Sequence, residues 1–326
     1  MRKITLLSTL AALAALFTTA AAQQDWPNRT ITLIVPFAPG GGIDVIARMQ
    51  AQQMSDILGQ TIVVENVGAA AGTIGSLRVA KSPPDGYTFL IANAGTHAYS
   101  QTLYKKPPYD AVADFTPVSL TTESPRILVA RKDLPVNNLQ EFIAYLKANR
   151  PNMQFGSAGV GSGTHIPCVL LNLAIGVDIT HVPYRGAGPV MQDLIGGRID
   201  YMCDTVQTGA VQAKQGNVKP IAIMAPHRLP IIPDLATTGE QGLPGVEASV
   251  WNAFFLPKGT PDAIVRRLNK AVSETLDNPA IRKRLEELGL EIVPPERRSP
   301  EYLAKFLAQE IDRWAKPIRA AGISMD

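Results

Sequence analysis

The first part of the chain alternates between short apolar runs and amphipathic stretches. Apolar residues from Ile31 to Val35 predict a strand, and apolar positions at helical spacing predict a helix from Ile43 to Leu58. Another strand, helix and strand follow, the last from Thr88 to Ala92 after an Asp-Gly turn. Such alternation predicts a parallel sheet with helices on both faces.

A second α/β unit is predicted downstream. Arg126 to Arg131 has the composition of a strand that leaves the first domain, with the crossing placed between Thr122 and Pro125. A helix from Leu139 to Ala148, capped by Asn138 with Glu141, comes next. Further strands are expected near Met153, Ile179, Ile199 and Val218, and a strand from Ala248 to Leu256 returns the chain to the first domain.

The last third of the chain is predicted to be helical and to serve packing. Thr260-Pro261 and Ser299-Pro300 each place a capping hydroxyl before a proline at the first helical position. A chain of this length exceeds the usual size of a single core. We therefore expect two domains, residues 23–123 with 248–326 and residues 124–247.

The N-terminus indicates export. Arg2-Lys3, an apolar run from Ile4 to Phe17 and Ala20-Ala-Ala22 form the three parts of a cleavable secretory signal covering residues 1–22. The alternative is a membrane anchor, but the run is shorter than the roughly 20 residues that span a bilayer. The expected location is therefore the periplasm.

Charge and cysteine content exclude some functions. The net charge is +3, two of the cations are in the signal, and no basic stripe appears, so a nucleic-acid partner is not expected. Cys168 and Cys203 are the two cysteines; in an oxidising compartment such a pair usually bridges, although two buried free thiols stay possible. The four histidines form no metal-ligand pattern, and neither a metal nor a cofactor is expected.

Glycine-rich loops in both units end at helix starts. The loop with Gly40 to Gly42 precedes the helix at Ile43, and the loop from Gly156 to His165 precedes an apolar helix. Unpaired N–H groups and the helix dipole attract anions there. Ser157, Ser162 and Thr164 add hydroxyls, which suits a carboxylate held between two domains.

These residues do not match the sequence motifs of known enzyme active sites. Ser162 lacks the flanking glycines of a nucleophile elbow, and no loop completes a dinucleotide or phosphate-binding fingerprint. Ser162, His165 and Asp204 could form a triad only if the fold assembled them. We therefore expect no catalytic activity.

Several polar residues at predicted loops admit two interpretations each. His165 is either a structural hydrogen-bonding residue or a ligand donor, as are Thr96 and His97. Arg185 is either a bidentate carboxylate partner or a surface arginine. For Asp204 and Asp44 a structural role, capping or bracing a helix start, is favoured over ligand contact.

The ordered motifs of the chain resemble a known family, the extracytoplasmic solute receptors of tripartite tricarboxylate transporters, the Bug or TctC-like proteins. The resemblance covers essentially the whole mature chain. It rests on Pro36-Phe-Ala-Pro-Gly-Gly-Gly-Ile-Asp44, Gly72-Thr-Ile-Gly75, Pro84-Asp-Gly-Tyr87, the Gly156 to His165 loop, His181-Val-Pro-Tyr-Arg-Gly-Ala-Gly-Pro189 and Leu256-Pro-Lys-Gly-Thr-Pro261.

The resemblance implies a two-lobed periplasmic binding protein of type II-like α/β fold, with two mixed sheets, helices on both faces and a ligand cleft between the lobes. It implies capture of a small organic carboxylate and delivery to a membrane permease by cleft closure, by a monomer. The ligand classes compatible with the resemblance are mono-, di- and tricarboxylates, aromatic acids and acidic amino acids. A sensing or chemotaxis receptor on the same fold is the alternative, and a secreted small-ester hydrolase is a third.

Carried over residue by residue, the resemblance implies a ligand site. One carboxylate end would lie between the first glycine-rich loop and the second-domain loop, and other residues would surround the distal end. The first set is Phe37, Ala38, Gly41, Gly42 and Asp44 with Ser157, Gly161, Thr164 and His165; the distal set is Ala94, Thr96, Tyr184, Arg185 and Asp204. Cys168 and Cys203 depart from the commonest family pattern, and if bridged they would rigidify the second-domain half of the site.

Overall fold

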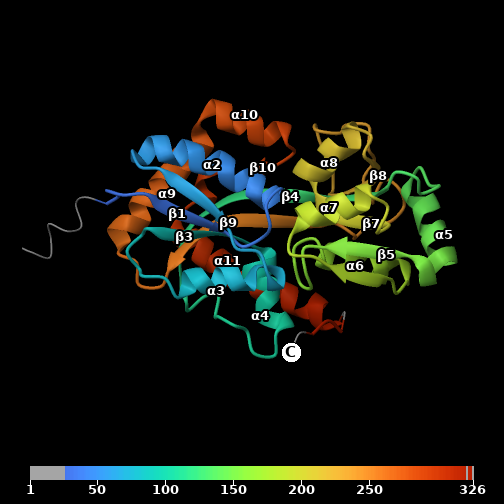
Figure 1. The fold of residues 1–326 in the computed structure, drawn as a ribbon, viewed down its shortest axis with the longest axis horizontal. Helices are drawn as coiled ribbons and strands as arrows, with labels where there is room; N and C mark the ends of the chain where they lie inside the picture. Colours follow the sequence, from blue (N-terminus) through green and yellow to red (C-terminus); the bar gives the residue numbers. More distant parts are fainter. Residues whose placement is uncertain (1–25, 321, 325–326) are drawn as a thin grey trace, which may run out of the picture.

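The computed structural model describes residues 26–320 and 322–324, which form two lobes joined by long strands through the middle of the molecule (Figure 1). The expected signal, residues 1–22, lies outside the described residues. Among the helices of the described part, none is long and apolar enough to cross a membrane.

The first lobe is built on a mixed sheet. Its strand order is β2-β1-β3-β9-β4, with β10 on β4; β1 is parallel to β2 and β3, whereas β9 is antiparallel to β3 and β4. The parallel core is the one that the sequence predicts. Its elements are β1 (Ile31–Val35), α2 (Gly42–Leu58), β2 (Ile62–Asn66), a 3-10 turn (Ala70–Gly72), α3 (Thr73–Ala80), β3 (Thr88–Asn93), a π-helical turn (Gly95–Tyr99), α4 (Ser100–Leu103), β4 (Phe115–Arg131), β9 (Ser249–Pro257), α9 (Asp262–Asp277), α10 (Pro279–Glu287), β10 (Glu291–Ile292), a 3-10 turn (Pro295–Arg297) and α11 (Pro300–Ala320).

The second lobe repeats the plan on a smaller scale. The C-terminal part of β4 pairs antiparallel with β7 and β8, and β5 lies parallel to β6 and β7. Its elements are α5 (Leu139–Asn149), a 3-10 turn (Arg150–Asn152), β5 (Gln154–Ser157), α6 (Ile166–Ile175), β6 (Thr180–Pro183), α7 (Ala187–Ile195), β7 (Tyr201–Thr205), α8 (Val206–Lys214) and β8 (Val218–Met224).

Each sheet carries an apolar core on both faces. In the first lobe, α2, α9 and α10 cover one face through residues such as Ile46, and α3, α4 and α11 cover the other. In the second lobe, α5 and α6 pack on one face and α7 and α8 on the other. Two covered sheets with separate cores are the expected fold class.

Strand β4 joins the two lobes without interruption. It pairs with β9 as far as Pro125 opposite Ser249, and from Arg126 onward it pairs with β7 and β8. Register shifts near Pro117 and Leu120 accommodate a proline within the ladder. The exchange of partners therefore lies at the C-terminal end of the stretch expected for the crossing.

Two of the three predicted helix caps are confirmed. The Asn138 side chain accepts from the Glu141 N–H at 2.9 Å, and the Ser299 hydroxyl accepts from the Tyr302 N–H at 3.0 Å. The prediction for Thr260 is wrong: its hydroxyl donates to the Pro257 carbonyl at 2.8 Å, and the helix begins only at Asp262. The hydroxyl closes the preceding turn instead.

The segment after β3 is not the open loop that the sequence predicts. The Thr96 N–H donates to the Asn93 side chain at 3.2 Å, and the Thr96 hydroxyl donates to the Asn93 carbonyl at 3.1 Å. These bonds start the π-helical turn at Gly95 and satisfy backbone polar groups locally. Within this turn His97 is fully buried.

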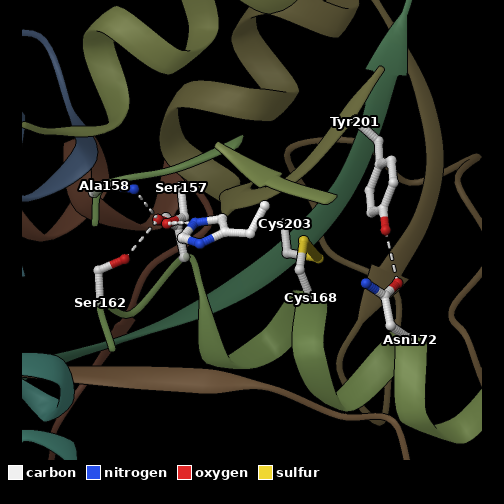
Figure 2. The surroundings of a disulfide bond; sticks show 9 residues. Ser157, Ala158, Ser162, Cys168, Asn172, Tyr201 and Cys203 are labelled. Atoms are coloured by element: carbon white, nitrogen blue, oxygen red, sulfur yellow. Dashed lines mark hydrogen bonds between the residues drawn. A yellow bond between two sulfur atoms is a disulfide. The ribbon is translucent and has the colours of Figure 1, made fainter. Parts of the chain in front are cut away.

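A disulfide joins Cys168 of α6 to Cys203 of β7, with the two Cα atoms 5.5 Å apart (Figure 2). Both residues are fully buried in the core between these elements. Close by, the Tyr201 hydroxyl donates to the Asn172 side chain at 2.7 Å and links the same helix and strand again. The bridge therefore fixes α6 and the loop before it against the sheet.

We expect replacement of both Cys168 and Cys203 by alanine to lower the free energy of unfolding by up to about 4 kcal/mol, because the bridge closes a loop with a sequence separation of 35. Denaturant titration of the oxidised protein and the double variant would measure the loss. Labelling of both thiols by an alkylating agent in denaturant without reductant would contradict the bridge itself.

Candidate ligand-binding site

A cavity lies where the two lobes meet. About 40 Å³ of it can hold the centre of a water molecule, so in this arrangement it suits only a small occupant. Both lobes contribute polar side chains and glycines to its wall. The first lobe supplies Phe37, Gly41, Gly42, Ile43, Asn93, Ser124 and Asn252; the second supplies Arg126, Ala158, Ser162, Gly163, Thr164, Ala187, Thr205 and Gln207.

The first-lobe wall contains the start of α2. The first helical hydrogen bonds run from the Asp44 and Val45 N–H groups to the Gly41 carbonyl, so the preceding N–H groups have no partner within the helix. A Cβ on Gly42 would lie 2.2 Å from the Thr205 hydroxyl oxygen of the other lobe. Glycine is therefore required there for the second lobe to reach the helix terminus.

The opposite wall contains the loop before α6. The Thr164 hydroxyl accepts from the Ala158 N–H at 2.9 Å and shares a 3.2 Å hydrogen bond with the Ser162 hydroxyl. These bonds hold the loop in shape with Gly163 and Thr164 at the cavity wall. Thr164 thus both shapes the loop and lines the site.

Two more helices of the second lobe begin at the cavity. Ala187 is the first residue of α7, and Thr205 and Gln207 flank the first residue of α8. Neither Thr205 nor Gln207 was predicted to lie at the site, although Thr205 ends β7 and Gln207 follows it, at the edge where open α/β sheets usually place their ligands. Helix N-termini from both lobes therefore surround one cavity, an arrangement that favours an anion.

Two predicted ligand residues contact each other at the rim of the cleft. The Ala38 N–H donates to the Arg185 carbonyl at 3.2 Å across the two lobes. Next to them, a Cβ on Gly188 would lie 2.4 Å from the Pro39 carbonyl oxygen. Ala38 and Arg185 thus bring the lobes together at the rim and do not line the cavity.

Asp44 braces the loop that carries the helix start. Its carboxylate accepts from the Gly40 N–H at 3.1 Å, the Asn66 side chain at 2.9 Å and Arg48 at 3.1 Å. Burial alone would raise the pKa of Asp44, but these hydrogen bonds hold the pKa below its usual value. The carboxylate is therefore charged and engaged within its own lobe.

Ser157, Gly161 and His165 form the scaffold behind the second-lobe loop. The Gly161 N–H donates to His165 Nδ1 at 3.1 Å, and the His165 ring lies 4.2 Å from the ring of His181, which shares a 2.7 Å hydrogen bond with Ser157. Burial lowers the pKa of His165 to about 3 and that of His181 to about 4. Both rings are therefore neutral, and none of these residues lines the cavity.

The residues expected at the distal end of the ligand are not brought to the cavity wall. Ala94 and Thr96 are fully buried in the helical turn, and the Tyr184 hydroxyl donates to Asp193 at 2.7 Å. Asp204 accepts from the Thr208 hydroxyl at 2.6 Å. Of the predicted ligand residues, Phe37, Gly41, Gly42 and Thr164 line the cavity.

The cavity wall also contains a charged residue, Arg126, that was not predicted to lie there. Arg126 is 2% exposed and lines the cavity at the first position of β4 within the second lobe. Burial lowers the pKa of Arg126 to about 10, so it stays protonated at neutral pH. Burial also raises the pKa of the nearby Asp204 to about 6.

The side chains considered for a catalytic triad or a metal site are not assembled into either in the described structure. No side-chain hydrogen bond in the described structure joins any two of Ser162, His165 and Asp204; Ser162 and His165 are linked through the backbone alone, where the His165 N–H donates to the Ser162 carbonyl at 3.0 Å. The described residues also contain no group of three or more histidine, cysteine or acidic side chains placed to hold a metal. The site is built of donors that can bind an anion.

Comparison with known proteins decides the family. Residues 46–323 match the family described as the tripartite tricarboxylate transporter family receptor. This chain belongs to that family. It has the fold of the TctC-like or Bug receptors, a family of periplasmic solute-binding proteins.

Three solved structures resemble this receptor over nearly its whole length. The periplasmic binding protein BugD is 37% identical, with a TM-score of 0.89 and coverage of 92% of this chain and 100% of its own. MatC from Rhodopseudomonas palustris, solved with malate, is 43% identical, with a TM-score of 0.86 over 89% and 99%. A second R. palustris protein, solved with adipate, is 36% identical, with a TM-score of 0.88 over 92% and 99%.

The neutral histidine pair gives this receptor a testable acid sensitivity. Unfolded histidines take up protons near pH 6.5, whereas His181 does so in the folded protein only near 4. The unfolded state then binds more protons, so the free energy of unfolding should fall as pH drops from about 6.5 toward 4. Denaturant titrations of the wild type and His181→Gln across this range should give a flatter pH dependence for the variant; equal slopes would contradict the assignment.

Proposed function

We propose that this protein is a periplasmic receptor that binds a small organic carboxylate between its lobes and delivers it to a tripartite tricarboxylate-type membrane permease. The observation that carries the proposal is the convergence of helix N-termini from both lobes on one cavity. Such termini supply N–H donors and partial positive charge, which match a carboxylate. The permease subunits are the proposed partners, and the receptor is proposed to act as a monomer.

The proposed ligand contacts come from both sides of the cleft. The α2 terminus with Gly41 and Gly42 would hold one carboxylate against Gly163 and Thr164 of the loop before α6. Phe37 supplies an apolar side chain to the same cavity. The remaining predicted residues, among them Asp44, Ser157, Gly161 and His165, would act by holding these two loops in shape.

Function would follow from closure. We place the lobes at residues 23–123 with 248–326 and at residues 124–247; the support is that β4 exchanges its partners two residues beyond this boundary, after Ser124 and Pro125, which still pair with β9 of the first lobe. A ligand that contacts both lobes binds the closed form more tightly than the open one, and so shifts the population toward it. The permease would recognise that closed form.

Dicarboxylates are the first ligands to test, because relatives were solved with malate and with adipate. We expect the purified protein, residues 23–326, to bind at least one acid from a panel of malate, succinate and adipate. A ligand present at 100 times its dissociation constant should stabilise the protein by about 2.7 kcal/mol, which a thermal melt would detect. No shift with any mono-, di- or tricarboxylate, aromatic acid or acidic amino acid would contradict the proposal.

Closure itself can be tested at Gly188. Replacement by alanine would place a Cβ 2.4 Å from the Pro39 carbonyl oxygen across the cleft, while alanine suits the start of α7. We expect affinity for the acid found in the panel to fall by at least ~10-fold, since the binding-competent form becomes less populated. Calorimetry and small-angle scattering at saturating ligand would show weaker binding and a larger radius of gyration.

The matched control for this substitution is Gly239→Ala. There the nearest atom to a Cβ would be the Thr237 hydroxyl oxygen at 3.8 Å, an ordinary contact away from the cleft. This variant should bind and close like the wild type. Unchanged affinity in Gly188→Ala would refute the idea that contact between the lobes at this rim accompanies binding.

A further inference from the structure

Arg126 places a full positive charge in the cavity wall at the junction of the lobes. It is the first residue of β4 after the exchange of partners, and its backbone N–H donates to the Ala248 carbonyl at 3.0 Å. Its side chain reaches toward the loop before α6, because a Cβ on Gly163 would lie 2.9 Å from Arg126 Nη2. The glycine leaves space beside the guanidinium.

The guanidinium has donors without partners. Arg126 Nε and Nη1 are buried and make no hydrogen bond, and no carboxylate of the described residues forms a salt bridge with it. Asp204 and Tyr99 influence it only through longer-range electrostatics. Burying a charged group without a hydrogen-bond or salt-bridge partner is strongly unfavourable in free energy.

A second buried arginine, Arg298, has the partners that Arg126 lacks. Arg298 is 3% exposed, yet its Nη1 pairs with Asp277 at 2.7 Å and its Nε donates to the Val293 carbonyl at 2.9 Å. The chain therefore satisfies a buried guanidinium where the role is structural. Arg126 instead lines the cavity with two of its guanidinium nitrogens unpaired.

A neighbouring amide adds to the same group of donors. Gln207 accepts from the Ser124 hydroxyl at 2.7 Å through its oxygen, which turns its Nε2 away from that bond, and Nε2 has no partner. Together the free nitrogens of Arg126 and Gln207 offer about five N–H bonds, whereas one carboxylate accepts about four. The helix N-termini come in addition, so the cavity supplies more donors than one carboxylate can use.

We propose that Arg126, assisted by Gln207, binds a second carboxylate of the ligand, so that the receptor selects dicarboxylates over monocarboxylates. This inference rests on the proposed function. The helix N-termini hold the first carboxylate, and the guanidinium and the amide hold the other. An arginine suits this place because its fork of donors matches a carboxylate bidentately.

The test compares two ligands that differ in one carboxylate, succinate and butyrate, in the wild type and in Arg126→Met. If succinate proves weak, malate or adipate replaces it, with the corresponding monocarboxylate. We expect the wild type to prefer the diacid and Arg126→Met to reduce that preference by at least about 30-fold, the range typical of a lost buried charge pair. Isothermal titration calorimetry gives both affinities.

Three outcomes separate the possibilities. An unchanged preference in Arg126→Met would overturn this inference while leaving the proposed function intact. Equal loss of both ligands would also overturn it, because Arg126 would then hold the only carboxylate. A wild type that binds no organic acid at all would overturn the proposed function together with the inference.

Two further variants guard against a purely structural explanation. Arg131→Met removes an arginine of the same strand that is paired with Asp133 and Asp200, and it should leave the ligand preference unchanged. Arg126→Lys keeps the charge without the bidentate fork and should retain part of the preference.

The melting temperature of the ligand-free variants provides a second readout. Arg126→Met should raise it, because methionine removes an unpaired buried charge, whereas Arg131→Met should lower it. A lower melting temperature for Arg126→Met, with an unchanged preference for the diacid, would assign Arg126 a structural role and overturn the proposal.

Discussion

The structure depends on the electrostatics of backbone N–H groups at helix starts. The N-termini of α2, α7 and α8, with the loop before α6, meet at one cavity although they belong to two separate lobes. Positive helix ends repel one another, so their gathering is unfavourable by itself. Two covered sheets, a disulfide and a continuous strand between the lobes hold them in place.

Glycine is the residue that lets these termini approach. At Gly42 and Gly188 any side chain would overlap atoms of the other lobe. Gly42 also presents backbone to the cavity, which a carboxylate can contact directly. Shape complementarity between the lobes and affinity for the ligand thus have the same origin, and a change at one of these glycines affects both.

Much of the fold was predictable because its signals are local. Apolar periodicity located β1 and α2, and the Asn138 and Ser299 caps followed from side chains three residues from their partners. The prediction was wrong at Thr260 and at the turn after β3. In both places a threonine hydroxyl donates to the carbonyl three residues earlier, that of Pro257 or Asn93. The predicted and the observed local structures differ there by a single hydrogen bond, and the amino-acid composition does not determine which of the two forms.

The sequence predicted the lining residues of the site that lie in loops, but not those that lie in strands. Gly41, Gly42 and Thr164 stand in glycine-rich segments that are visible in the sequence, and they line the cavity. Asn93, Asn252 and Arg126 stand in strands whose pattern predicts core, and only the pairing of β3, β9 and β4 brings them together. Their roles depend on tertiary contacts between segments more than 100 residues apart, as the hydrogen bonds between Thr121 or Thr122 and Asn252 illustrate.

The position of Arg126 on the connecting strand bears on the order of events during capture. Rotation of two lobes about a hinge displaces atoms at the fulcrum least and atoms at the rim most. In the proposed closure, Arg126, on the strand that joins the lobes, lies at the fulcrum and the Ala38 to Arg185 contact lies at the rim. We expect an incoming acid to meet the guanidinium first, while the mouth is wide, and to be enclosed by the glycine-lined rim only afterwards.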